Sequence, residues 1–284
     1  TNNNIFLDRP LDFPFDGTLD SHFGVNRIVP IINASAEGIT IRTGAGATSY
    51  PFNTGLAVHG GLRGCVINPC VKPNGVVANT YANDTFGFCV EECTYLRGTF
   101  GGWDRGQAGI MRGCRCLNIG MASHEAGEGQ SFCIIEGNLF LGYRAGGGAN
   151  NALIGVGTPC WGLSIVGNQF SGPKTGTNFA VRVNGGQGIQ VIGNHIRSAD
   201  HALAISAAYT DWRQPRNVVI SGNVVVMNPA PGGNPCIYVD GYPYSKGIVV
   251  QGNSLTGGNP SYAGVKLQNG SAIGCVIGPN SYTA

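Results

Sequence analysis

The feature that most constrains this chain is a short apolar run that recurs along it and closes each time on Asn or Cys. Examples are FCIIEGN, LSIVGN, IQVIGN, NVVISGN and IVVQGN. Three positions before the closing residue the side chain is always apolar, and five positions before it is apolar or small. This period of two predicts a β-strand with one buried face. Aligned on the closing residue, the chain contains nine such anchors, 21 to 30 residues apart: Cys70, Cys93, Cys114, Asn138, Asn168, Asn194, Asn223, Asn253 and Asn280.

The spaces between the anchors hold further short strands and sharp corners. From Asn138 onward a second apolar run starts directly after the anchor, and a third follows in most repeats, such as Leu153 to Val156. Asn tolerates the backbone of a sharp bend, and Gly allows a tight corner. No stretch of a dozen residues with helical apolar spacing is free of Gly or Pro, and the 47 Gly residues fit corners. The repeat therefore predicts an all-β solenoid with three short parallel strands in each coil.

The pattern I-x-G-N-x-F/I at residues 135–140, 165–170 and 191–196 resembles that of the right-handed parallel β-helix superfamily, which includes pectate lyases, polysaccharide epimerases and bacteriophage tailspikes. The resemblance implies a single-stranded right-handed parallel β-helix of about nine or more coils over residues 39–284. Handedness comes from the resemblance alone. Residues 1–38 lack the register and are expected to form an N-terminal lead-in or capping segment.

Composition excludes several classes of protein. The formal net charge is +2 with no basic stripe, which argues against nucleic-acid binding. No apolar stretch approaches the roughly 18 residues of a membrane span, so no membrane insertion is expected. The five His show no ligand spacing, and the Gly-rich segment at residues 145–148 lacks a following Lys. We therefore expect no cofactor and no metal.

The ten Cys allow two interpretations. Five disulfides are arithmetically possible in an oxidising compartment. In the register, however, Cys70, Cys93 and Cys114 take the corner position, while Cys65 and Cys133, like Cys275, take an inward strand position, where a small buried hydrophobe fits. Stacked free thiols are favoured over disulfides, which the spacing between coils still permits.

The best acid and base candidates point outward two positions before three consecutive anchors. Glu91, Arg112 and Glu136 would lie on adjacent coils, with the two carboxylates about 9.6 Å apart. That separation is at the wide end of what inverting glycoside hydrolysis uses. Asp104 is close enough in sequence to join them. The alternative, a salt-bridged surface ladder without chemistry, is favoured on the residue types alone.

A second candidate site lies in the inserted loops of later coils. Asp211, Trp212 and Arg213 lie in one loop, and Asp240 and Tyr242 come one coil later. Aromatic rings stack on sugars, while Asp and Arg hydrogen-bond hydroxyl groups, so these residues are expected to bind substrate. Contact with a neighbouring subunit explains them equally well.

The position four before each anchor should also point outward, yet seven of the nine residues there are apolar. Such a stripe is normally covered. The N-terminal segment, long turns or a second subunit can provide the cover. Because tailspikes are trimers of side-by-side β-helices, the resemblance implies a homotrimer.

The resemblance favours a phage tailspike-like protein, in the virion or otherwise extracellular, that binds bacterial surface polysaccharide. The residues leave open whether it also cleaves that polysaccharide as an endo-glycosidase. The alternatives are a non-catalytic structural β-helix that decorates a virion or cell surface, and a secreted polysaccharide lyase. The sequence blocks typical of polygalacturonases and mannuronan epimerases are absent, which lowers the case for those enzymes.

Overall fold

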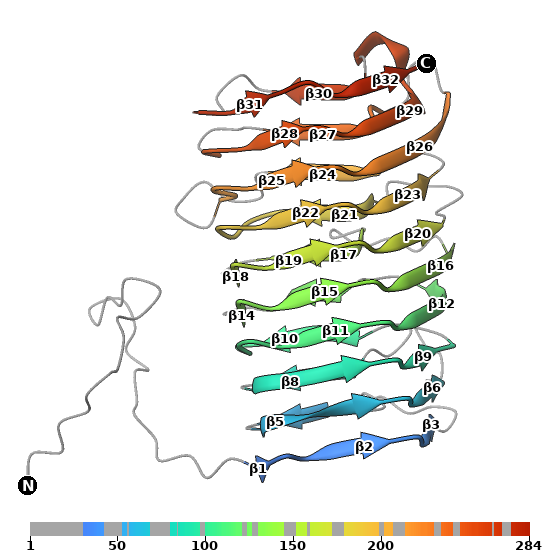
Figure 1. Cartoon of the computed structure of the whole chain (residues 1–284), viewed down its shortest axis with the longest axis vertical. Helices are drawn as coiled ribbons and strands as arrows, with labels where there is room; N and C mark the ends of the chain where they lie inside the picture. Colours follow the sequence, from blue (N-terminus) through green and yellow to red (C-terminus); the bar gives the residue numbers. More distant parts are fainter. Residues whose placement is uncertain are drawn as a thin grey trace, which may run out of the picture.

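The computed structural model is a stack of parallel β-strand coils (Figure 1). It describes residues 31–42, 53–55, 57–68, 80–83, 85–96, 100–120, 124–126, 130–144, 152–157, 160–171, 179–198, 202–206, 214–229, 234–240, 245–262, 264–268 and 274–284. Every strand pairing within this part of the chain is parallel, and each strand pairs with its counterpart in the next coil.

The first sheet contains the strands that precede the anchors. Its order is β1 (Ile31–Ile32), β5 (Ala57–Arg63), β8 (Phe86–Glu91), β11 (Ile110–Arg112), β15 (Ile134–Glu136), β19 (Ser164–Val166), β22 (Gln190–Ile192), β25 (Val219–Ser221), β28 (Val249–Gln251) and β31 (Val276–Ile277), with β2 (Ser35–Glu37) also on β5. A two-stranded sheet, β14 (Gln130–Ser131) with β18 (Cys160–Trp161), precedes two of these strands.

The second sheet contains the strands that follow the anchors. Its order is β3 (Thr40–Arg42), β6 (Val66–Asn68), β9 (Thr94–Tyr95), β12 (Arg115–Gly120), β16 (Leu139–Arg144), β20 (Gln169–Ser171), β23 (His195–Ser198), β26 (Val224–Pro229), β29 (Ser254–Gly258) and β32 (Ser281–Thr283).

The third side of the coils is divided into two sheets. The early coils contribute β4 (Asn53–Gly55), β7 (Thr80–Asn83) and β10 (Phe100–Asp104). The later coils contribute β13 (His124–Ala126), β17 (Ala152–Val156), β21 (Phe179–Val183), β24 (Leu203–Ser206), β27 (Ile237–Asp240) and β30 (Val265–Gln268), and one short 3₁₀ turn, η1 (Pro260–Tyr262), precedes β30.

The predicted fold class, an all-β right-handed parallel β-helix, is confirmed. The coil count differs from the expected nine or more, because only six coils are closed by one continuous third sheet. The boundary at residue 39 falls inside the first described coil, since β1 and β2 already pair with β5. Residues 1–30 of the expected capping segment lie outside the described residues.

Corners with a left-handed backbone separate the first sheet from the second. Gly167, Gly193 and Gly222 have φ of 63°, 64° and 64°, a region that L-residues with a side chain rarely adopt. Glu92 takes the same corner with φ of 54°. The anchor Asn that follows each Gly turns inward and is buried. The I-x-G-N pattern is thus the sequence of this corner.

The interior is filled by stacked apolar side chains. Trp103, Tyr95 and Phe88 are fully buried in the early coils. Phe140 and Phe170 stack on adjacent coils, with ring centroids 4.9 Å apart. Burial of this continuous column supplies most of the favourable free energy, as in other solenoids.

The register of the first coil corrects the sequence alignment. The run that precedes Cys65 belongs to the first sheet, so Cys65 takes the corner position beside Cys93 and Cys114. Asn68 lies in β6 of the second sheet, and Cys70 lies outside the described residues. The nine described Cys carry free thiols. Among the described residues, no helix is long and apolar enough to span a membrane.

Candidate functional site

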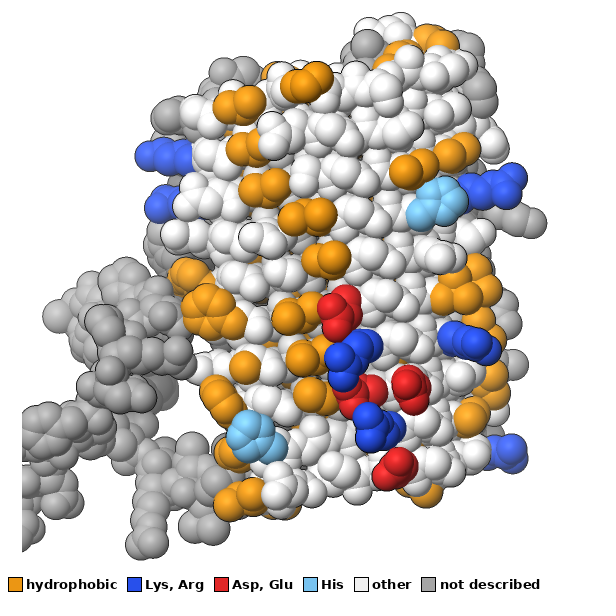
Figure 2. Space-filling model, viewed as in Figure 1, with side chains coloured by type: hydrophobic (Ala, Val, Ile, Leu, Met, Phe, Trp, Pro, Cys, Tyr) orange, Lys and Arg blue, Asp and Glu red, His pale blue; other side chains and the backbone are white. Residues whose placement is uncertain are grey.

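A line of alternating charges crosses the outer face of the first sheet. Strand register places five side chains at one position on successive coils, and we call them the charge ladder: Glu37, Arg63, Glu91, Arg112 and Glu136. Figure 2 shows acidic and basic side chains alternating along the lower half of this face, with apolar ones continuing above. The predicted alignment of Glu91, Arg112 and Glu136 on adjacent strands is therefore what the structure contains.

Glu91 is at the centre of the ion pairs. Its Oε1 accepts a hydrogen bond from Arg112, and its Oε2 lies 3.5 Å from Nη2 of Arg63. Arg112 also lies 3.8 Å from Glu136 through Nη1. Glu91 is 17% exposed, whereas Arg112 and Glu136 are 52% and 39% exposed. The hydrogen bond to Glu91 raises the pKa of Arg112. Both oxygens of Glu91 are thus engaged, and Glu136 is the more accessible carboxylate.

Sequence reasoning missed Glu37 and Arg63 because the first coil was aligned on Cys70. A local signal for both was present. Arg63-Gly64-Cys65 repeats the order of Arg112-Gly113-Cys114, and Glu37-Gly38-Ile39 repeats the charge-glycine-apolar order one coil earlier. The glycines at these corners have φ of 59°, 63° and 64°. A charged residue before a left-handed Gly therefore marks four of the five ladder positions, whereas Glu91 precedes the left-handed Glu92.

Aromatic side chains line the N-terminal edge of the first sheet, four or five residues before the ladder position of their coils. Phe86 and Phe132 are 42% and 50% exposed, and Trp161 is half-buried on the strand next to Phe132. Phe132 has φ of 54°, which is unusual for a bulky residue. Its ring lies over Gly162, 2.7 Å from where a Cβ would be. We call Phe86, Phe132 and Trp161 the aromatic edge. An exposed aromatic ring on strained backbone is typical of a binding surface.

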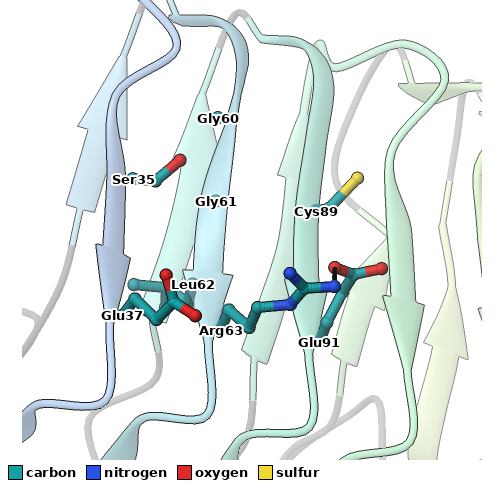
Figure 3. A pocket seen from close by; sticks show the side chains of 8 residues that line it. All are labelled: Ser35, Glu37, Gly60, Gly61, Leu62, Arg63, Cys89 and Glu91. Carbon is teal, nitrogen blue, oxygen red and sulfur yellow. Dashed lines mark ion pairs between the residues drawn. The ribbon is translucent and has the colours of Figure 1, made fainter.

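A pocket of about 210 Å³ lies at the N-terminal end of the ladder (Figure 3). Leu62 and Gly60 contribute to its lining together with the ladder residues Arg63 and Glu91. Gly61 forms part of the floor, where a Cβ would collide with the carbonyl oxygen of Cys89. The remaining lining residues are Ser35, Glu37 and Cys89.

The Cys89 thiol in this pocket is not activated. Burial raises its pKa, and the neighbouring carboxylate of Glu91 raises it further. Burial also raises the pKa of Cys133 to about 12. Nucleophilic thiols have a lowered pKa, so these residues act as small apolar side chains.

The other predicted site residues are not gathered at the ladder. Asp104 ends β10, which pairs with β7 on the third side, whereas Glu91 ends β8 of the first sheet. Asp240 ends β27 and is half-buried between Ser206 and Gln268 on adjacent strands. Asp211, Trp212, Arg213 and Tyr242 lie outside the described residues. Within the described part of the chain, no group of three His, Cys, Asp or Glu can hold a metal ion.

Comparison with known proteins supports the architecture. No protein-family model matches the chain, and no curated protein matches it. Among solved structures it is similar to PfbA, a surface adhesin of Streptococcus pneumoniae, with a TM-score of 0.56 and 13% sequence identity. The alignment covers 89% of this chain and 70% of that chain. At this identity the likeness shows a shared β-helix fold.

Proposed function

We propose that this protein is a surface-exposed β-helix that binds bacterial polysaccharide on the outer face of its first sheet. The observation that carries the proposal is the aromatic edge on the same face of the molecule as the charge ladder. Aromatic rings stack on the apolar faces of sugars, while carboxylate and guanidinium groups hydrogen-bond hydroxyl groups. The fold it shares with a surface adhesin supports the same role. Because a rigid sheet holds the aromatic edge and the charge ladder in place, no loop has to become ordered when the glycan binds.

The test is binding of the full chain to a panel of capsular and O-antigen polysaccharides, measured by calorimetry or biolayer interferometry. Phe132→Asn removes the exposed ring but suits the left-handed backbone, because Asn tolerates positive φ. We expect it to weaken binding about tenfold or more while the unfolding midpoint is maintained. Ser254→Ala, an exposed change on the second sheet, is the matched control. Absence of binding to every glycan, or unchanged binding by the Phe132 variant, contradicts the proposal.

Hydrolysis is a second candidate function, favoured by the in-register placement of Glu91 and Glu136 two coils apart. Glu136 is the more accessible of the two carboxylates and is assigned the role of acid, and Glu91, which contacts Arg63 and Arg112, is assigned the role of base. The same incubations test it through new reducing ends, which Glu136→Gln and Glu91→Gln should abolish. Release of unsaturated uronate would indicate a lyase instead. If no glycan is cleaved, the protein binds without catalysis.

The free thiols bear on where the protein acts. Buried free Cys are typical of chains that fold in a reducing compartment, whereas secreted proteins rich in Cys usually form disulfides. We therefore propose a tailspike-like virion protein, assembled inside a host cell, in preference to a secreted one. Alkylation of the denatured, unreduced protein should modify all ten Cys. Fewer modified residues would indicate disulfides and favour secretion.

A further inference from the structure

The pocket at the N-terminal end of the charge ladder contains a carboxylate that the ladder does not neutralise. The ladder has three Glu and two Arg. Arg112 contacts Glu91 and Glu136, and Arg63 contacts Glu91. Figure 3 shows the Arg63 side chain extending toward Glu91 and away from Glu37. Among the described residues, Glu37 has no ion pair, and it is exposed at the rim of the pocket.

The groups around Glu37 suit a polar ring. Ser35 precedes Glu37 by two positions on β2, so both side chains point to the outer face of the sheet. The Ser35 hydroxyl can donate or accept a hydrogen bond. Gly60 and Gly61 lie on β5, between β2 and β8. Because they have no side chains, they leave space for the pocket above this strand. The half-buried Cys89 adds an apolar contact. The volume of about 210 Å³ is sufficient for one sugar residue and too small for a longer segment.

We infer that this pocket is a subsite for one sugar residue that carries a protonated amino group. The ammonium would pair with Glu37, and the ring hydroxyl groups would hydrogen-bond to Ser35 and to the Arg63–Glu91 pair. A neutral sugar would gain no ion pair with the exposed Glu37, and an acidic sugar would be repelled by it. The inference rests on the proposed glycan-binding function, because it assigns the type of sugar residue that binds at one end of the charge ladder.

The experiment compares two probes on the full chain, a β-1,4-linked glucosamine tetrasaccharide and its fully N-acetylated counterpart, by calorimetry at low and moderate salt. The wild type should bind the free-amine probe about threefold more tightly, as one solvent-exposed ion pair allows, with a preference that falls as salt screens the pair. Glu37→Gln should remove this preference, and Glu37→Asp should restore part of it. Gln251→Ala, at the same outward position on the distant strand β28, should leave it unchanged.

A second variant tests the pocket without changing charge. Ser35→Leu fills the pocket from an exposed strand position and should weaken binding of the free-amine probe, with the unfolding midpoint maintained. Equal binding of the two probes by the wild type, or a preference that survives Glu37→Gln, overturns the subsite. If polysaccharides still bind in a Phe132-dependent manner in that case, the proposed function stands without the subsite. If no glycan binds at all, the proposed function fails as well.

Discussion

At the scale of single residues, the corner asparagines form a buried row of hydrogen bonds through the later coils. Nδ2 of Asn194 donates to the carbonyl oxygen of Ile165 at 2.9 Å and to Oδ1 of Asn223 at 3.0 Å. Its Oδ1 accepts from the backbone N–H and the Nδ2 of Asn168, at 2.9 and 3.0 Å. Asn is the side chain that both donates and accepts here, so each member satisfies its neighbours on both sides.

Asn194→Ala should therefore lower the free energy of unfolding by about 3 to 5 kcal/mol, because it leaves several buried groups on both neighbouring coils unpaired. Asn280→Ala, at the end of the row, should cost much less. Asn280 is half-buried and accepts from Asn253, but no described asparagine follows it. Urea unfolding followed by circular dichroism measures both values. Equal decreases in the free energy of unfolding for the two variants would show that the hydrogen bonds of the row do not act cooperatively.

At the scale of strands, the sequence predicted the first sheet wherever the corner is Gly-Asn. Strands β15, β19 and β22 end at the residue before each Gly, as the alternation requires. The prediction was wrong for the first coil. Cys65 and Cys70 each close an apolar run there, and alignment on Cys70 shifted the predicted register by five residues. An odd shift exchanges the two faces of a strand. Because of this shift, Asn68 was assigned to the ladder position that Arg63 occupies, and Glu37 and Arg63 were missed.

The charged part of the site was predictable and the aromatic part was not. Glu91, Arg112 and Glu136 follow from period two and the coil register alone. Phe86, by contrast, is two positions before the buried Phe88, so alternation places it inside. The left-handed Gly87 between them, with φ of 65°, reverses that direction and exposes Phe86. Phe132 is exposed at the equivalent corner of a later coil, where the sequence has no Gly to mark it.

At the scale of the whole molecule, the outer face of the first sheet has a charged half on its early coils and, on its later coils, a half where apolar side chains alternate with Ser and Gln. Above Glu136 the ladder position is occupied by Val166 and Ile192. The neighbouring outward position has Val219, Val249 and Val276 on successive coils, and Val276 is 51% exposed. Figure 2 shows a line of apolar side chains above the charged ones on this face. An apolar line of this length, partly exposed on the described surface, favours association with another surface.

We predict that further copies of this chain cover the apolar line. Three chains would pack side by side along the later coils of the first sheet, which leaves the charged half free to bind glycan. Light scattering should then give a mass about three times the 29.5 kDa of one chain. Val249→Lys should reduce it to that of the monomer, because an interface does not bury an unpaired ammonium group without a large cost. Ser254→Lys adds the same charge on the second sheet and should leave the trimer intact. A monomeric wild type, or a Val249→Lys variant that stays trimeric, would move the interface away from this face. Since each coil is held mainly by its neighbours, the monomeric variant should keep its β-sheet circular dichroism, which separates loss of assembly from loss of fold.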